Sequence, residues 1–183
     1  MPNNVRNSVI IVGKDQEKVA ELVGLKLDEP KFDFNAIIPI PTEIETTKAD
    51  PTITQTGEEA DKINSEFVPN QWNNMPIQAI SQDEKDRRLK EYGAIDWYSA
   101  HNAYWGTKWG AYDIRNVVIC DEYVFVQFDT AWSHSDAIFN GIEKQYEVEV
   151  HAYIDGEIDS PDYYGYPYSY LNIETIIEPA SRL

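Results

Sequence analysis

The chain has 183 residues, and its 15 Lys and Arg stand against 32 Asp and Glu, which gives a formal net charge of −17. This charge repels phosphate backbones and anionic lipid head groups, so it argues against direct binding of nucleic acid or of a membrane surface. Apolar residues make up 42% and aromatic residues 13%, more than a disordered acidic chain carries. We therefore expect one folded domain over residues 1–183.

The compartment is indicated by two absences. The single cysteine, Cys120, excludes an intramolecular disulfide framework and is typical of a reducing compartment. The first residues lack a cationic segment followed by a long apolar one, and no stretch reaches the ~18 apolar residues of a membrane span. These features predict a cytoplasmic protein without a membrane-spanning segment.

The first forty residues read as strand, helix and strand. Residues 5–12 end in a β-branched run and predict a buried strand. Asp15 is a candidate N-cap for a helix over 16–25, where apolar residues fall at helical spacing. The apolar run 32–41 predicts a second strand, ended by two prolines that cannot donate to a ladder.

A polar stretch and a long helix follow. Residues 42–80 are interrupted by proline and glycine and predict an insertion or long loop. Ser81 and Glu84 form a capping-box pattern, and the apolar periodicity beyond them predicts a helix over about 82–103, weakened in its middle by Gly93.

The second half of the chain is rich in strand patterns. Residues 114–120 and 123–129 predict an antiparallel hairpin with a longer or bulged turn. Ser133 is a candidate N-cap for the next helix. Residues 146–154 alternate between apolar and polar and predict a half-buried strand, whereas 155–183 read as an acidic, Tyr-rich extension with a final strand.

This order predicts an α+β fold, a ferredoxin-like α/β plait with a mostly antiparallel sheet and a large central insertion.

Two tryptophan motifs are the most distinctive segments. In 105–111 (WGTKWGA), Gly106 can end the preceding helix, and Trp105, Lys108 and Trp109 form either an aromatic platform with a central cation or indoles that pin the helix end onto the sheet. In 128–133 (FDTAWS), Trp132 precedes the expected N-cap, where an apolar residue packs as a staple. Core packing explains both motifs without a ligand, and we favour it.

These motifs, together with the segment 34–41, resemble the YubB-like ferredoxin-like family of uncharacterised proteins from phages, plasmids and bacterial genomes. The similarity covers roughly residues 5–41 and 85–154. It implies a ferredoxin-like domain encoded by a mobile element, and it assigns no activity to Trp105, Lys108, Trp109 or Trp132. The chain departs from the family pattern after Ser133, where prolines are usual, and in its Tyr-rich tail.

Catalytic and metal-binding patterns are absent from the sequence. The three histidines have no zinc-ligand spacing, and the acidic loop that starts at Asp155 lacks the glycine and the closing glutamate of a calcium loop. No phosphate-binding glycine loop or nucleophile motif occurs. We therefore predict no catalytic residue, no metal and no cofactor.

The leading hypothesis is a non-enzymatic phage or mobile-element protein that acts in the cytoplasm of the host cell, where it binds and modulates a host protein. A defence nuclease with a basic nucleic-acid-binding groove is one candidate target, because residues 121–183 contain thirteen acidic and two basic residues. The expected partner-binding residues are acidic and tyrosine side chains of the C-terminal third: Glu147, Glu149, Asp155, Glu157, Asp159, Asp162, Tyr163, Tyr164, Tyr166 and Tyr168.

Three alternatives stay open. The acidic charge can serve solubility alone. The chain can be an enzyme that acts on a nucleotide or nucleic acid, with its site between sheet and insertion. The Tyr-rich segment can be a self-association surface that makes a homo-oligomer.

Overall fold

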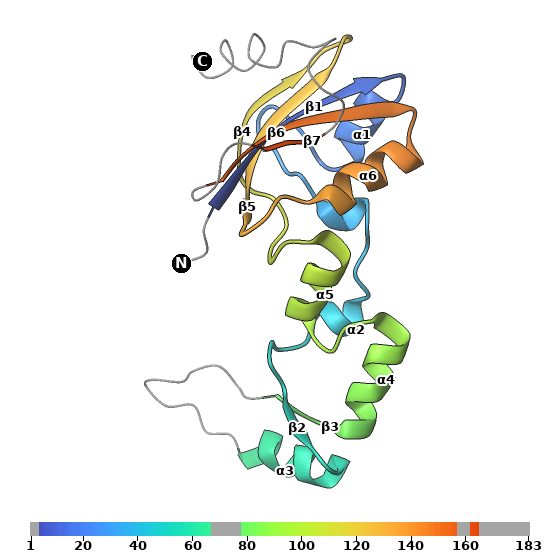
Figure 1. Ribbon diagram of the computed structural model, residues 1–183, viewed down its shortest axis with the longest axis vertical. Helices are drawn as coiled ribbons and strands as arrows, with labels where there is room; N and C mark the ends of the chain where they lie inside the picture. Colours follow the sequence, from blue (N-terminus) through green and yellow to red (C-terminus); the bar gives the residue numbers. More distant parts are fainter. Residues whose placement is uncertain (1–3, 67–77, 157–161, 165–183) are drawn as a thin grey trace. The chain divides into compact units, whose positions relative to one another are not determined.

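The computed structural model describes residues 4–66, 78–156 and 162–164. These residues divide into two compact units (Figure 1). Unit 1 combines the described residues within 1–39 with those within 105–183, and unit 2 comprises those within 40–104. None of the described helices has the length and apolar character that crossing a bilayer requires.

Unit 1 is built on an antiparallel sheet of five strands in the order β4-β5-β1-β6-β7. The strands are β1 (Asn4–Gly13), β4 (Tyr112–Ile119), β5 (Val124–Ala131), β6 (Val148–Gly156) and β7 (Asp162–Tyr164). β1 lies in the centre and pairs with β5 on one side and β6 on the other. The predicted strands at 5–12 and 146–154 and the predicted hairpin are confirmed, and four residues connect the two strands of that hairpin. The α+β class with an antiparallel sheet is thus established.

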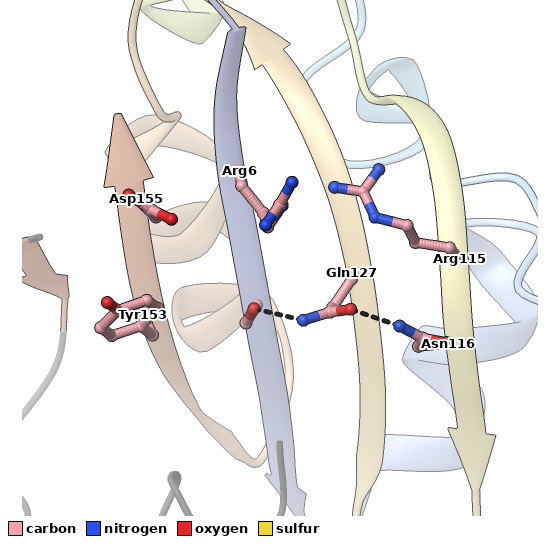
Figure 2. Close-up of a pocket in the computed structure, with 7 residues that line it drawn as sticks. Arg6, Arg115, Asn116, Gln127, Tyr153 and Asp155 are labelled. Carbon is pink, nitrogen blue, oxygen red and sulfur yellow. Dashed lines mark hydrogen bonds between the residues drawn. The ribbon is translucent and has the colours of Figure 1, made fainter. Parts of the chain in front are cut away.

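The two faces of this sheet differ. Helices α1 (Gln16–Leu22) and α6 (Asp136–Gln145) lie on one side of it. The side chains beneath them are apolar and buried, as with Val9 and Ile11 of β1 or Val150 and Ala152 of β6. Figure 2 shows the opposite face, where polar side chains stand on the strands. The helices bury one face because their apolar stripes need a partner. The opposite face combines these polar side chains with a buried apolar cluster of Ile10 and Phe125.

The predicted strand at 32–41 is wrong. A 3-10 turn, η1 (Phe34–Ala36), stands there, and the Asp33 carboxylate caps it by accepting a hydrogen bond from the Asn35 amide at 2.9 Å. Phe34 packs its ring against Phe32, Phe128 and Trp105. The apolar run is therefore a core-filling turn, because a buried strand and a buried turn have the same local apolar signature.

Unit 2 contains regular structure where the sequence predicts a long loop. Its elements are α2 (Thr42–Glu45), β2 (Thr52–Thr54), α3 (Gly57–Glu66), β3 (Ala79–Ser81), α4 (Gln82–Tyr92) and α5 (Trp97–Trp105). β2 and β3 pair in parallel as a short two-stranded sheet. The Thr-rich composition conceals these elements because each strand has only three residues, too few for a periodic pattern.

The predicted long helix over 82–103 is two helices. Ser81 caps α4 as expected, since its side chain accepts a hydrogen bond from the Glu84 amide. Gly93 then ends α4 in the left-handed region at φ 68°, and Asp96 starts a new turn by accepting from the Ser99 amide at 2.7 Å. The apolar face also differs from expectation, because Leu89 is exposed whereas Arg88 is buried.

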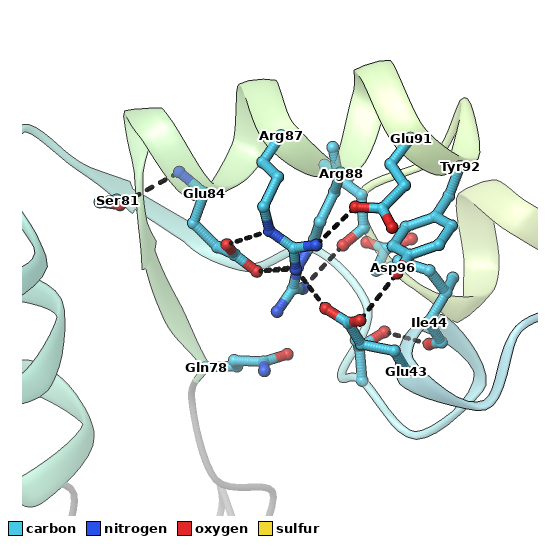
Figure 3. A network of polar contacts seen from close by, with 12 residues as sticks. Glu43, Ile44, Gln78, Ser81, Glu84, Arg87, Arg88, Glu91, Tyr92 and Asp96 are labelled. Atoms are coloured by element: carbon cyan, nitrogen blue, oxygen red, sulfur yellow. Dashed lines mark hydrogen bonds and ion pairs between the residues drawn. The ribbon is translucent and has the colours of Figure 1, made fainter.

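A network of charged side chains explains the buried arginine (Figure 3). Glu84 accepts from Arg88 Nε at 2.7 Å and from Arg87 Nε at 2.8 Å, while Arg87 also contacts Glu43 and Glu91. Arg88 Nη1 donates to the Ile95 carbonyl at 2.9 Å. These contacts fix α4 against the turn that follows it, and hydrogen bonds from Arg87 and Arg88 lower the pKa of Glu84 to about 2.

We expect Glu84→Gln to weaken the acid sensitivity of unit 2. A carboxylate whose pKa is lowered from 4.5 to about 2 on folding stabilises the native state above pH 4.5, and this stabilisation is lost as the pH falls towards 2. Because Glu84 is partly exposed, the effect should be on the order of 1 kcal/mol. Urea unfolding from pH 7 to pH 2, followed at α4 amides by NMR, measures it. Glu91→Gln is the matched control, with the same change of charge on the same helix. An unchanged pH slope in Glu84→Gln would contradict the prediction.

Candidate functional site

The two tryptophan motifs come together in unit 1, although about twenty residues separate them in the sequence. Thr107 Oγ1 donates to the Ala131 carbonyl at 2.8 Å. The Ser133 and Ser135 hydroxyls donate to the carbonyls of Gly106 and Trp105, respectively. Three side-chain to backbone bonds thus join the segment 105–107 to the segment 131–135. The predicted N-cap at Ser133 is wrong, because Ser135 caps α6 by accepting from the Ile138 amide and leaves Ser133 for this junction.

Trp105 is the structural tryptophan of the first motif. It is 3% exposed, its Nε1 donates to the Ile38 carbonyl at 2.9 Å, and its ring meets Phe34 edge-on at 5.6 Å. Gly106 follows in the left-handed region at φ 76° and ends α5. The predicted helix termination at Gly106 and core packing of Trp105 are both confirmed.

Trp109 and Trp132 are exposed instead. Their exposed fractions are 38% and 48%, so the expectation that both motifs pack their indoles into the core is wrong for these two residues. Lys108 Nζ lies 4.7 Å from the Trp109 ring centroid and 5.0 Å from that of Trp132, within cation–π range of both rings. Lys108, Trp109 and Trp132 are hereafter the Trp–Lys–Trp cluster.

The backbone of this cluster is strained. Trp132 has φ 74°, a left-handed conformation that a bulky residue rarely adopts. The hydroxyl contacts of Ser133 and Ser135 lie directly after it and hold the chain there. Trp109 contacts Tyr112 edge-on with centroids 6.1 Å apart. Strain of this kind persists where surrounding contacts over-determine it, and it concentrates at functional positions.

A second site lies on the open face of the sheet, where a pocket of about 360 Å³ crosses four strands. It is lined by Arg6 and Ser8 of β1, Arg115 and Asn116 of β4, Gln127 of β5, and Tyr153 and Asp155 of β6 (Figure 2). Gln127 forms its floor: the amide nitrogen donates to Ser8 Oγ at 2.8 Å, and the amide oxygen accepts from Asn116 Nδ2. These residues are hereafter the sheet pocket.

The two arginines of the sheet pocket have different surroundings. Arg115 Nη2 donates to Asp129 Oδ1 at 2.5 Å and Nη1 to the Asp113 carbonyl at 2.6 Å. Arg6 is exposed and makes no hydrogen bond or ion pair with another residue of the described ranges. Sequence reasoning missed both, although Arg6, Ser8, Gln127 and Arg115 are polar residues in strands, a pattern that marks a polar sheet face.

The acidic residues expected to bind a partner lie in mixed surroundings. Glu147 pairs with Lys14 at 2.9 Å, and Glu149 lies 3.5 Å from His151. Asp155 lines the sheet pocket with Arg6 and Arg115. The two glutamates are well exposed, with side-chain fractions of 70% and 81%, so they are accessible to a partner.

The C-terminal part of the predicted surface is described only in its backbone. Asp162, Tyr163 and Tyr164 form β7, which pairs antiparallel with β6. Glu157, Asp159, Tyr166 and Tyr168, as well as the predicted final strand, lie outside the described residues. Within the described ranges, no group of three or more His, Cys, Asp or Glu is placed to hold a metal ion.

Comparison with known proteins adds no relative on which these sites can be mapped. No protein-family model matches the chain, and neither a curated protein nor a solved structure was found to be similar.

Proposed function

We propose that this protein is a binding protein, not an enzyme, and that the Trp–Lys–Trp cluster anchors it to a basic partner protein. The observation that carries the proposal is the exposure of Trp109 and Trp132 on either side of one lysine, held by a strained backbone. Exposed tryptophans are the residue type that most often dominates the energy of a protein interface.

The charge of the chain selects the partner. A formal charge of −17 speeds association with a positively charged protein and opposes binding to an acidic one. The exposed parts of Trp109 and Trp132 suit the guanidinium and lysine side chains of such a partner, because aromatic rings attract cations. Glu147 and Glu149 would add acidic contacts at the edge of the interface.

The fold supports the same proposal. In unit 1, β1-α1, then β4 and β5, then α6-β6 follow one another, and the strand order is β4-β5-β1-β6. This is the order of a ferredoxin-like plait, to which we assign unit 1, with residues 40–104 as its central insertion. The resemblance of the tryptophan motifs to mobile-element proteins makes a host protein the expected partner, and a host defence nuclease is one candidate because its nucleic-acid groove is basic.

In the test, the full chain is immobilised and incubated with host extract. The proteins that it captures are compared with those captured by Trp109→Ala and by Trp132→Ala. Capture alone is not support, so the recovered protein is then purified and titrated against each variant. We expect a basic partner whose affinity falls about tenfold or more in each tryptophan variant and falls as salt rises.

Leu27→Ala is the matched control, since Leu27 is an apolar side chain of unit 1 that is 73% exposed. It should leave the affinity unchanged. Circular dichroism verifies that the variants fold, as both indoles are substantially exposed. A partner that binds both tryptophan variants as tightly as the wild type would refute the proposal. The proposal would also be refuted if light scattering showed that the protein self-associates through the Trp–Lys–Trp cluster.

A further inference from the structure

We propose that the sheet pocket binds a free mononucleotide, with the phosphate between Arg6 and Arg115, the sugar hydroxyls at Asp155 and the base on Tyr153. The inference is independent of the Trp–Lys–Trp cluster and of any protein partner. It concerns different residues of unit 1, none of which belongs to the cluster.

Arg6 and Arg115 form the phosphate-binding part of the proposed site. Figure 2 shows their guanidinium groups directed towards each other across β5, on strands β1 and β4. Two of the donors of Arg115 are used by Asp129 and the Asp113 carbonyl, whereas Arg6 has no hydrogen bond or ion pair to any residue that the structure describes. A planar guanidinium matches the oxygens of a phosphate bidentately, so the two groups together form an anion-binding fork.

The irregular local geometry of β4 produces this arrangement. Neighbouring residues of a regular strand point to opposite faces, yet Arg115 and Asn116 both line the pocket. The register of β4 against β5 shifts on both sides of Arg115, and Asp113 and Asn116 have φ of 48° and 51°. Such bulges re-aim side chains next to binding sites, and the strain they store is characteristic of functional positions.

The β6 side of the pocket, where Asp155 is the register partner of Arg6, selects a ligand that also has hydrogen-bond donors and a ring. Asp155 and Tyr153 lie two residues apart on β6 and therefore share a face. A carboxylate accepts hydrogen bonds from sugar hydroxyls, and an aromatic ring stacks with a nucleobase at about 1–3 kcal/mol. A simple inorganic anion would use the arginines but neither of these groups.

Size and charge favour a single free nucleotide over nucleic acid. The pocket volume of about 360 Å³ lies at the lower end of the range for small-molecule sites, which is roughly 300–1,000 Å³. The net charge of −17 repels a polyphosphate backbone, whereas a mononucleotide brings one compact charge to the fork.

The test is calorimetric titration of the full chain with the 5′-monophosphates of adenosine, guanosine, cytidine and uridine. Inorganic phosphate, the unphosphorylated nucleosides and a 5′-phosphorylated oligonucleotide are titrated in parallel. We expect at least one monophosphate to bind, whereas its nucleoside and inorganic phosphate should each bind about tenfold more weakly or not at all. We also expect the monophosphate to shift the Nε resonances of Arg6 and Arg115 in NMR spectra.

Arg6→Gln is the decisive variant, because the exposed Arg6 side chain makes no hydrogen bond or ion pair with a residue that the structure describes, and the substitution leaves the backbone pairing of β1 intact, so the fold should be unaffected. It should lower the affinity by about tenfold or more, while Lys26→Gln, an exposed cation of unit 1 outside the pocket, should change it less than about twofold. Tyr153→Leu should weaken nucleotide binding without changing the affinity for inorganic phosphate.

Four outcomes would overturn the inference: no monophosphate binds at millimolar concentration, Arg6→Gln binds as tightly as the wild type, inorganic phosphate binds as tightly as the nucleotides, or the oligonucleotide binds more tightly than any free nucleotide. None of these results affects the basic-partner proposal, since Trp109 and Trp132 are unchanged in every variant.

Discussion

Replacing Phe34 with alanine is expected to lower the unfolding free energy of unit 1 by about 3–5 kcal/mol. Phe34 is 1% exposed and meets three other aromatic rings, those of Phe32, Phe128 and Trp105, at centroid distances of 5.9, 6.1 and 5.6 Å. Removing its ring leaves a cavity at the point where η1, β5 and the first tryptophan motif meet, and a rigid core cannot collapse to fill it.

This loss should be measured by residue-resolved hydrogen exchange at β1 and β5, because the two compact units need not unfold together. Phe34→Leu is the control: it retains an apolar side chain in the same place and should cost much less. Phe34→Ala should also disturb the first tryptophan motif, since a ring atom of Phe34 lies within 4 Å of the position that a Cβ on Gly110 would occupy. If Phe34→Ala matched Phe34→Leu in stability, the importance assigned to this aromatic cluster would be wrong.

Replacing Gly13 with alanine is expected to destabilise unit 1 by on the order of 3 kcal/mol. Gly13 has φ 145°, and a Cβ placed on it would lie 2.3 Å from the Glu147 carbonyl oxygen and 2.7 Å from Val148 Cα. These are backbone atoms at the start of β6, which pairs with β1, so relief of the clash requires the two strands to separate locally.

Alanine substitutions at two other glycines separate the cost of backbone strain from the cost of the steric clash. Gly93→Ala introduces strain alone, because Gly93 has φ 68° but no atom near its added Cβ. Gly57→Ala should be nearly neutral, since it has neither a positive φ nor a neighbour within 4 Å. We expect the order Gly13, Gly93, Gly57 in urea unfolding, each read at amides of its own unit. A Gly13→Ala protein as stable as Gly57→Ala would show that β6 yields at this point more easily than a paired strand should.

The two proposed binding surfaces are linked through β4 and β5. Trp109 of the Trp–Lys–Trp cluster contacts Tyr112, which pairs with Asp129 in the sheet register. Asp129 in turn holds Arg115 of the sheet pocket at 2.5 Å. Both surfaces therefore depend on the same irregular stretch of β4, and variants such as Arg6→Gln, which lies on β1, test the pocket without disturbing the cluster.

Much of the sheet is predictable from the sequence because its signals are local. The β-branched run at 9–12 and the alternation at 146–154 predict strands directly, and they appear as β1 and β6. Gly106 and Ser81 were likewise predictable as a helix end and a helix start, since capping depends on residues within one turn. The strand prediction for residues 32–41 was wrong, because a buried turn and a buried strand share the same apolar pattern.

The sequence by itself therefore determined the fold class, the strongly acidic charge and two helix ends, the start of α4 at Ser81 and the end of α5 at Gly106. All of these depend on composition or on neighbours along the chain, whereas the Asp15 side chain does not cap α1 and the predicted cap at Ser133 was wrong. The tertiary structure decided which residues meet. It placed Trp109 and Trp132 on the surface around Lys108, and it brought Arg6 and Arg115 onto one pocket from strands more than a hundred residues apart. These sites arise from strand register and a bulge, which depend on long-range pairing and leave no periodic pattern in the chain.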